Sequence, residues 1–365
     1  MSQVIKILKD IVSIKSVTPN DGGILKYIEN YLPEYQAEYF NKNGVSNLLL
    51  KKRFSDGEYL CFAGHIDVVP SGENWKYDPF SAIEKDGYIY GRGTQDMKSG
   101  VSAMVETLKT TTNFRGTLSL LLTSDEEGEA EFGTVMVLQE LKERGELPDY
   151  SIITEPTCET EFGDIIKVGR RGSINGTLII QGKQGHVAYP KKSINPIHMF
   201  SKKLEKLAGY QFDNGNQFFD SSQLIITDIR GGLEVTNVTP DNLKIMFNVR
   251  NSTETTLNDV KIYVENICSD LDFSLKIFQS SSPFLTDKDS KIVKILDKSV
   301  SEICKTEPHL STGGGTSDAR FMGEFGVKVA EFGVRNDRIH SINERTSIDE
   351  VEKLYQVCKK VIENF

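Results

Sequence analysis

The chain has 365 residues, of which 38% are hydrophobic and 26% are charged. This length suggests about two domains, and the composition excludes a disordered chain or a coiled coil. With 43 basic against 52 acidic residues, the formal net charge is −9, so the chain has no general electrostatic reason to bind nucleic acid or an anionic membrane.

The first predicted element is an amphipathic N-terminal helix with five apolar residues on one face, Val4, Ile5, Leu8, Ile11 and Val12. The segment lacks the uncharged core and the cleavage site of a signal peptide. No stretch of the sequence approaches the roughly 20 apolar residues of a membrane span. The five cysteines are scattered and form no CxxC pair, which indicates neither a disulfide framework nor a cysteine-rich zinc site. We therefore expect a cytoplasmic protein.

Short apolar runs rich in β-formers alternate with helical patterns over residues 1–171. Strands are predicted at Tyr59–Ala63, Thr117–Thr123 and Ser151–Thr154, and helices at Lys98–Lys109 and Glu131–Glu143. Buried strands that alternate with helices are typical of layered α/β proteins. We expect a central mixed sheet with helices on both faces.

The pattern changes between residues 172 and 284, where six predicted elements follow one another as β-α-β-β-α-β. They are Ser173–Gln181, Ile194–Leu207, Gln223–Ile229, Leu243–Arg250, Leu257–Ile267 and Phe273–Phe278. This order is that of a ferredoxin-like α+β unit, for which about 110 residues suffice. The α/β pattern then resumes with helices at Lys291–Cys304 and Ile348–Ile362. We therefore predict one domain of residues 1–171 and 285–365 that carries an inserted domain of residues 172–284.

Candidate ligands follow several predicted strands at the point where each strand ends. They are His65 and Asp67 after Tyr59–Ala63, Asp96 after Tyr88–Tyr90, Glu126 and Glu127 after Thr117–Thr123, Glu155 after Ser151–Thr154, and His340 after Val327–Phe332. In open α/β sheets the ligand crevice lies outside the carboxyl ends of the strands. We therefore expect these groups to converge on one site.

The chemistry of this set suits a metal centre. Two imidazoles and several carboxylates without a thiolate match Zn²⁺. One carboxylate between two histidine-containing half-sites can bridge a metal pair about 3.5–4 Å apart, and Asp96 is the natural bridge. Glu126 lies beside a ligand without being needed as one, so it is the candidate to take a proton from metal-bound water. Asp67 is the candidate to orient the His65 imidazole.

Each of these residues alone has a structural alternative. A His-x-Asp pair at a strand end is more often a hydrogen-bonded turn, and a Glu-Glu pair is usually solvated surface. Their joint occurrence at successive strand ends favours the metal site. The glycine-rich run Gly313–Gly315 lacks the lysine of a P-loop, so we interpret it as a loop whose backbone N–H groups approach an anionic substrate.

Five segments, in chain order, resemble the aminoacylase/carboxypeptidase family of co-catalytic zinc hydrolases: GHIDVVP, GRGTQDMKSG, LTSDEEGEA, ITEPT and IHSINE. The resemblance extends over essentially the whole chain, including the inserted domain. It implies two Zn²⁺ ions per subunit, for which Co²⁺ can substitute, with Asp96 as the bridge, His65 and Glu155 on one ion, and Glu127 and His340 on the other. It also makes Glu126 the general base, with Asp67 as a supporting catalytic residue, and implies a cis peptide bond between Asp96 and Met97.

The resemblance further implies a homodimer with a small-molecule substrate. The inserted domain would form the dimer interface, and His186 would reach the site of the partner subunit. Seven residues are implied as substrate contacts: Arg170, Ser173, Tyr189, Arg250, Gly315, Thr316 and Asn336. Three positions, at two places in the sequence, depart from the family pattern. Thr94 and Gln95 replace the small residues usual before the bridging Asp96, and Ser99 stands where glycine is common.

Two stretches, VGRRGSINGTLIIQGKQGHVAYP and STGGGTSDARF, indicate the substrate within this family. Their arginines favour a terminal carboxylate, as in a succinyl group, over an acetyl group. The resemblance thus implies hydrolysis of N-succinyl-LL-2,6-diaminopimelate to succinate and LL-2,6-diaminopimelate, on the bacterial route to lysine and peptidoglycan. The alternatives are another deacylase or peptidase of the family, such as acetylornithine deacetylase, and a binding protein without activity. Retention of Glu126 argues against the last, because a binding site needs no base.

Overall fold

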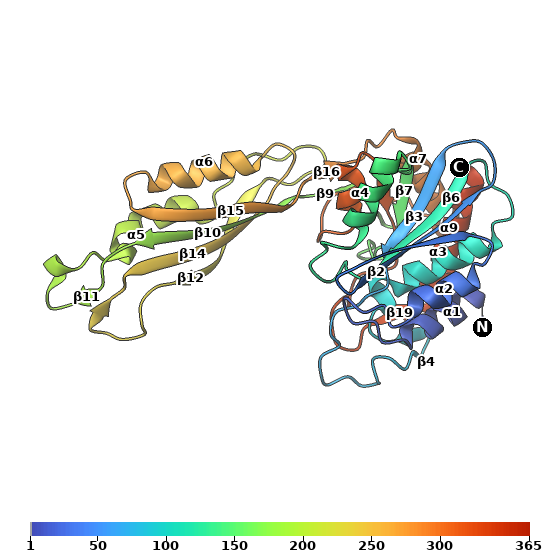
Figure 1. Cartoon of the computed structure of the whole chain (residues 1–365), viewed down its shortest axis with the longest axis horizontal. Coiled ribbons are helices and arrows are strands. Elements are labelled where there is room, and N and C mark those ends of the chain that lie inside the picture. Colours follow the sequence, from blue (N-terminus) through green and yellow to red (C-terminus); the bar gives the residue numbers. More distant parts are fainter. Residues whose placement is uncertain (1) are drawn as a thin grey trace. The chain divides into compact units, whose positions relative to one another are not determined.

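The computed structural model describes residues 2–365, which form two compact units (Figure 1). Unit 1 contains the chain up to Gly169 together with Leu285–Ser311 and Ser317–Phe365. Unit 2 contains Arg170–Phe284 and the short stretch Thr312–Thr316. By its contacts this stretch therefore lies with unit 2, although the sequence pattern alone assigns it to the first domain.

Unit 1 is built on an eight-stranded mixed sheet in the order β1-β2-β6-β3-β7-β18-β8-β17. The strands are β1 (Gln36–Lys42), β2 (Val45–Arg53), β3 (Tyr59–His65), β6 (Thr117–Thr123), β7 (Tyr150–Ile153), β8 (Ile165–Lys167), β17 (His309–Ser311) and β18 (Lys328–Glu331). β3 pairs in parallel with both β6 and β7, and β7 pairs in parallel with β18. The carboxyl ends of these four strands therefore lie at one edge of the sheet.

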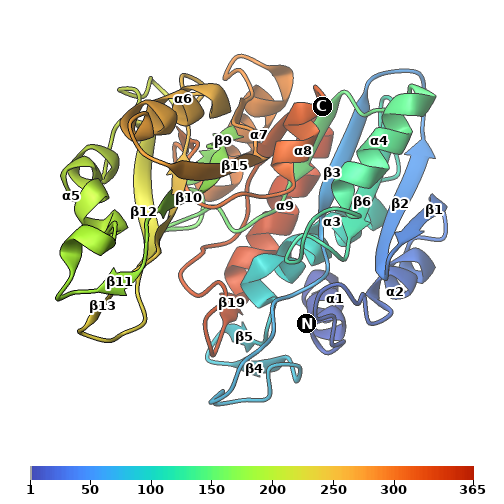
Figure 2. The same cartoon turned by 60° about the vertical axis from the view of Figure 1, so that its left-hand side comes forward.

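Helices pack against the sheet of unit 1 in two groups. The first group is α1 (Gln3–Val12), α3 (Ser99–Thr110), α7 (Lys291–Cys304) and α9 (Ile348–Asn364), and the second is α4 (Thr134–Arg144) and α8 (Ala319–Glu324). Figure 2 shows α3 and α9 side by side. All five apolar residues predicted on one face of the first helix are buried. The predicted α/β class, with a central mixed sheet flanked by helices, is confirmed.

A small antiparallel sheet completes unit 1 and has a direct bearing on the site. It consists of β4 (Ile83–Lys85), β5 (Tyr88–Tyr90) and β19 (Arg345–Ser347), in the order β19-β5-β4. Arg345 pairs with Tyr90, so the segment after β5 and the segment before β19 run beside each other. One carries Asp96 and the other carries His340. The remaining helix of unit 1 is α2 (Ile24–Tyr31), near the N-terminus. Within residues 2–365, no helix is both long and apolar enough to cross a membrane.

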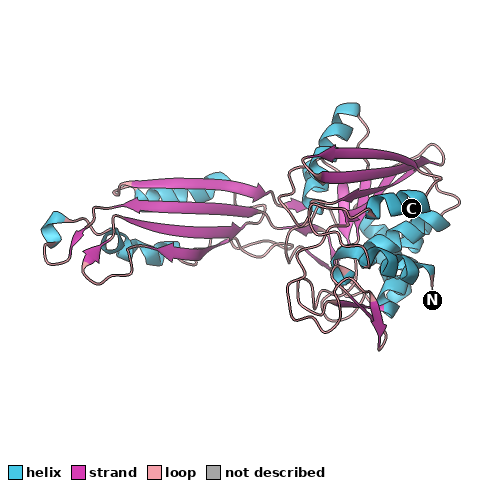
Figure 3. Ribbon diagram, turned by 60° about the horizontal axis from the view of Figure 1, so that its bottom comes forward, coloured by secondary structure: helices cyan, strands magenta, loops and turns pink. Residues whose placement is uncertain are grey.

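Unit 2 is a four-stranded antiparallel sheet with two helices behind it (Figure 3). Its elements are β10 (Ser173–Gln181), α5 (Pro196–Leu207), β12 (Gln223–Arg230), β14 (Asn242–Arg250), α6 (Leu257–Cys268) and β15 (Phe273–Ser281). They follow the predicted β-α-β-β-α-β order, and the strands are arranged as β12-β14-β10-β15. Short pieces flank them: β9 (Gly169–Arg170), β11 (Gly185–His186), β13 (Val238–Thr239), β16 (Phe284–Leu285) and a 3₁₀ turn at Pro190–Lys192.

Gly176 allows the two central strands of unit 2 to pack closely. It pairs with Phe247 of β14, and a Cβ atom at position 176 would lie 2.0 Å from Cζ of that ring. Phe247 is buried in the core beneath the helices, so the ring has no open space to enter. We expect Gly176→Ala to lower the free energy of unfolding by about 1–3 kcal/mol, as measured by urea denaturation. Gly231→Ala, whose methyl group meets no atom closer than 3.3 Å, should change it far less.

Candidate metal centre

The predicted ligands stand at the edge where the parallel strands of unit 1 end. His65 is the last residue of β3, Glu127 follows β6, and Glu155 follows β7. Asp96 lies in the segment Thr94–Lys98 between β5 and α3, where its backbone angles are not helical. His340 lies in the loop between β18 and β19. Because β3, β6 and β7 are parallel neighbours, their ends bring these side chains together.

Asp96 occupies the centre of the cluster. Its Oδ1 lies 3.2 Å from His65 Nε2, and its Oδ2 lies 3.4 Å from His340 Nε2. Each carboxylate oxygen therefore faces a different histidine, as a bridging carboxylate requires. Glu127 and Glu155 complete the two half-sites: Glu127 Oε1 is 2.9 Å from His340 Nε2, and Glu155 Oε1 is 3.7 Å from His65 Nε2.

The donor atoms of this cluster fit a zinc-type metal. His65, Asp96 and Glu127 each offer a ligand atom, and these atoms lie within 4.8 Å of one another. Imidazole nitrogen and carboxylate oxygen are the ligands of catalytic zinc sites. The peptide bond between Asp96 and Met97 is cis, which confirms what the family resemblance implied.

Asp67 lies beside the His65 imidazole, the residue that it is predicted to orient. The His65 imidazole bonds through Nδ1 to the backbone carbonyl of Asp67 at 2.9 Å, while the nearest carboxylate oxygen is 3.6 Å away. This bond leaves Nε2 directed at Asp96. The Asp67 carboxylate also accepts hydrogen bonds from the backbone amides of Glu126 (3.4 Å) and Glu127 (3.1 Å). Asp67 therefore ties the ends of β3 and β6 together.

In the absence of metal, the pKa values of several side chains in the cluster are raised, so these groups hold protons more tightly. Burial, together with the charges of Asp318 and Asp96, raises the pKa of Glu126 to about 8, against the lowering effect of the His65 charge. Burial also raises the pKa of Glu155 well above its usual value. Hydrogen bonds to Asp96 and Glu127 raise the pKa of His340 to about 10.

The pKa of His65 is also raised, although burial acts to lower it. Burial by itself lowers the pKa of this imidazole, but hydrogen bonds to Asp67 and Asp96 outweigh that effect and hold the pKa well above its usual value. Near neutral pH, the His340 imidazole, with its pKa of about 10, therefore carries a proton that a metal ion must displace.

We expect metal binding to release protons. The neutral imidazole is the ligand, and the pKa of His340 is about 10 in the metal-free protein, so about one proton or more should leave per subunit at pH 7. Protons compete with the metal for the imidazole nitrogen, so the metal affinity should rise with pH as long as the pH lies below the pKa of His340. An indicator dye during titration of metal-free protein with Zn²⁺ measures the release. His309→Ala, outside the cluster, should leave it unchanged, and a pH-independent affinity between about pH 6 and 8 would contradict the expectation.

The predicted substrate contacts fall mainly in unit 2, whereas all five predicted ligands lie in unit 1. Asn336 is the exception, and its backbone N–H donates to the Cys158 carbonyl at 2.9 Å. Within unit 2, Arg170 is buried and donates from Nη1 to the carbonyls of Gly313 (3.3 Å) and Gly315 (3.1 Å). The glycine run therefore contacts this guanidinium through its carbonyl groups.

The other predicted contacts of unit 2 lie on and beside its sheet. Ser173 begins β10, and its Oγ accepts a hydrogen bond from Asn248 at 2.9 Å. Arg250 ends β14. His186 and Tyr189 form one exposed pair with ring centroids 5.9 Å apart, and Tyr189 is 60% exposed. Thr316 follows Gly315 in the stretch that clusters with this unit.

Sequence reasoning missed Asp318. It is buried at the start of α8, and its Oδ2 accepts a hydrogen bond from Thr134 Oγ1 at 2.6 Å. Among the negative charges near Glu126, that of Asp318 raises the Glu126 pKa most strongly. The available signal was an acidic residue directly before a helix within the glycine-rich GGGTSDAR stretch, but such residues are common helix caps.

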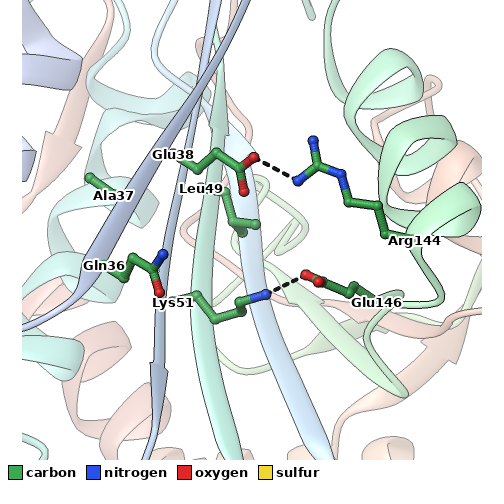
Figure 4. A pocket seen from close by; sticks show the side chains of 7 residues that line it. All are labelled: Gln36, Ala37, Glu38, Leu49, Lys51, Arg144 and Glu146. Atoms are coloured by element: carbon green, nitrogen blue, oxygen red, sulfur yellow. Dashed lines mark hydrogen bonds and ion pairs between the residues drawn. The ribbon is translucent and has the colours of Figure 1, made fainter.

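A separate hollow of about 460 Å³ lies beside β1, β2 and the end of α4 (Figure 4). Its charged side chains pair among themselves: Glu38 with Arg144 at 2.6 Å, and Lys51 with Glu146 at 2.6 Å. Lys51 lies opposite Ser119 near the beginning of β6, whereas the predicted ligand Glu127 follows the end of that strand. Because its charges are mutually neutralised, we assign this hollow no role in the chemistry.

The fold and the cluster together define a metal-dependent hydrolase. The chain belongs to peptidase family M20/M25/M40, whose family model matches residues 61–364. It is 57% identical over 362 residues to the succinyl-diaminopimelate desuccinylase of a Sulfurovum species, with 99% of each chain covered. It is 55% identical over 363 residues to the protein of the same name from Sulfurimonas denitrificans, with 100% of each covered.

Solved structures share the fold of this chain at low sequence identity. The aminopeptidase PepT from Bacillus cereus superimposes with a TM-score of 0.82 at 21% identity, over 99% of this chain and 98% of that one. The YXEP protein of Bacillus subtilis, described as a dinuclear metal-binding peptidase from the M20 family, gives a TM-score of 0.73 at 15% identity, over 98% and 96%.

Proposed function

We propose that this protein hydrolyses N-succinyl-LL-2,6-diaminopimelate to succinate and LL-2,6-diaminopimelate, a step toward lysine and peptidoglycan precursors. The observation that carries the proposal is the retained cluster of His65, Asp96 and Glu127 beside Glu126, in a chain that matches full-length succinyl-diaminopimelate desuccinylases at 52–57% identity. A biosynthetic hydrolase acts where its substrate is made, so the cytoplasm stays the predicted location.

The proposed cofactor is a pair of Zn²⁺ ions per subunit, which Co²⁺ can replace. Asp96 would lie between the ions, with His65 and Glu155 on one and Glu127 and His340 on the other. The contact of each Asp96 oxygen with a different histidine supports this division. When bound, such a pair supplies Lewis acidity, which lowers the pKa of water toward neutrality and polarises a carbonyl group.

Glu126 is the proposed general base and later proton donor. Burial raises the pKa of its carboxyl group to about 8 in the metal-free protein, and bound cations beside it would favour the ionised form that accepts a proton. The Asp67 carboxylate fixes the backbone amides of Glu126 and Glu127, so the base keeps its position relative to its neighbouring ligand. In the reaction, Glu126 would accept the proton of the attacking water and pass it to the departing amine.

The succinyl end is proposed to bind to arginine. Arg170 and Arg250 offer planar pairs of N–H donors that match a carboxylate, and two backbone carbonyls hold the Arg170 guanidinium in one orientation. The other proposed contacts are Ser173, Tyr189, Gly315, Thr316 and Asn336. An acetyl group has no terminal carboxylate, and this difference distinguishes the proposal from an acetylornithine deacetylase.

A homodimer is also proposed, in which unit 2 forms the interface and His186 serves the site of the partner subunit by stabilising the developing oxyanion. The outer strand β12 supports this arrangement. It stands at one end of the sheet order, and Ile225 and Ile229 along it are 52% and 46% exposed. An outer strand with exposed apolar side chains can pair with its twin about a two-fold axis.

One assay tests the proposed activity. Metal-free protein and protein reconstituted with Zn²⁺ are compared on N-succinyl-LL-2,6-diaminopimelate and on N-acetylornithine. We expect turnover of the succinyl substrate that depends on metal, and little with the acetyl substrate. Preference for the acetyl substrate would favour the deacetylase, and absence of turnover on both would contradict the proposed function.

A further inference from the structure

The loop that carries Asp96 is held by a buried carboxylate that the proposed mechanism does not use. Glu344 is fully buried, and its Oε1 accepts hydrogen bonds from the backbone amides of Gln95 (2.8 Å) and Asp96 (3.2 Å). Its Oε2 accepts from the backbone amide of Gly93 at 2.9 Å. Successive N–H groups that converge on one anion fix the path of a loop. Here they fix the residue that bears the central carboxylate of the cluster.

The same carboxylate is connected to the loop that carries His340. Arg92 pairs with Glu344 through Nη1 at 2.7 Å. Its Nη2 donates to the backbone carbonyl of His340 at 3.3 Å, and its Nη1 to that of Ser341 at 3.3 Å. The buried ion pair therefore contacts the backbone at both Asp96 and His340, whose side chains face each other across 3.4 Å.

The His340 backbone needs such support. Its φ angle is 58°, in the left-handed region that residues with a Cβ atom seldom adopt. The Arg92 guanidinium donates hydrogen bonds to the backbone carbonyls of His340 and Ser341. These bonds stabilise the backbone at the residue that has the positive φ angle. Without these bonds, the loop would be freer to relax and to turn the imidazole away from Asp96.

Gln95 forms a second connection between the two loops. Its Nε2 donates to Asp337 Oδ1 at 2.7 Å, and its Oε1 accepts from the backbone N–H of Arg338 at 2.9 Å. This residue is one of the departures from the family pattern, in which a small side chain is usual at this position. A small side chain could form neither bond. The long amide therefore ties the Asp96 loop to the His340 loop in this chain.

We propose that Glu344, Arg92 and Gln95 are positioning residues that hold Asp96 and His340 at the spacing needed to bind two metal ions. The inference rests on the proposed metal pair. Ligands of a catalytic metal must be held to within a few tenths of an ångström, and outer residues that orient ligands typically affect metal affinity by about 10–100-fold. The ion pair of Arg92 and Glu344 holds the backbone of both loops, and the uncharged side chain of Gln95 adds two hydrogen bonds between them.

The test compares metal affinities by competition with a chromophoric chelator. Glu344→Gln keeps the side-chain shape but loses the charge and turns an NH₂ donor toward amide donors, so we expect the affinity for Zn²⁺ to fall about 10–100-fold. Gln95→Ala should cause a smaller loss. In the Co²⁺-loaded protein, both variants should change the visible absorption, which reports ligand geometry.

The matched control is Glu350→Gln. Glu350 is also a buried carboxylate, and it bonds to the side chain of Arg335 at 2.6 Å and to its backbone amide at 3.1 Å. Like Glu344, Glu350 is buried and bonds to an arginine side chain and a backbone amide. Within residues 2–365, none of its hydrogen bonds is to Asp96 or His340. Its variant should lose stability in urea while retaining wild-type metal affinity. Equal losses of affinity in Glu344→Gln and Glu350→Gln would mean a general effect of stability and would overturn the proposal.

Gln95→Ala keeps the test decisive where Glu344→Gln does not fold. An unchanged affinity and Co²⁺ spectrum in folded Gln95→Ala would then refute the positioning role. Turnover of the succinyl substrate by the wild type is measured in parallel. Absence of that turnover would contradict the proposed function, whereas the comparison of metal affinities would still decide the positioning role.

Discussion

Glu126→Gln should abolish nearly all hydrolysis while the protein keeps its metal. The amide has almost the same shape as the carboxyl group but neither accepts nor returns a proton, and general acid–base catalysis typically contributes about 10²–10⁴-fold to the rate. Glu126 adjoins Glu127 in sequence, but it is Glu127 that contacts His340, so the ligand set is left intact. We expect kcat to fall by at least about 10²-fold, with the metal content unchanged by elemental analysis.

Glu129→Gln is the matched control for this variant, because Glu129 lies in the same loop with its side chain exposed. It should retain both metal and turnover. Loss of zinc from Glu126→Gln would assign Glu126 to the ligands instead. Preserved turnover in that variant would remove Glu126 from the proton transfer altogether.

Mixing two inactive variants should restore activity if His186 serves the partner subunit. In a heterodimer of Glu126→Gln and His186→Ala chains, one site combines an intact Glu126 with His186 of the other chain, and the second site lacks both. Random assortment makes about half of all dimers mixed, so about a quarter of the wild-type sites should be recovered. The variants are denatured together and refolded, and turnover is compared with that of each variant refolded alone.

The control mixture combines Glu126→Gln with Asp96→Ala. Both residues lie in unit 1 and belong to the same proposed cluster, so exchange of subunits cannot rebuild a complete site. This mixture should stay inactive. If the first mixture is inactive as well, although light scattering shows a dimer, His186 acts within its own chain or has no part in the reaction.

The sequence by itself determined the α/β class and the set of candidate ligands. Hydrophobic patterns with the period of a strand or of a helix depend only on residues close together in the sequence, so they can be recognised without knowledge of the fold. His65, Glu127 and Glu155 were found because they follow buried strands, and parallel strands share the edge at which they end. The six elements of unit 2 were predicted in their observed order because local periodicity also identifies them.

Only the tertiary structure decided how these groups support one another. The Asp67 carboxylate bonds to the backbone amides of Glu126 and Glu127, and Glu344 holds the Asp96 loop from a position far along the chain. Such contacts depend on which segments the fold places side by side, here the pairing of β5 with β19, and no local periodicity encodes that choice. The raised pKa of Glu126 has the same origin, because it arises from burial and from charges contributed by distant segments.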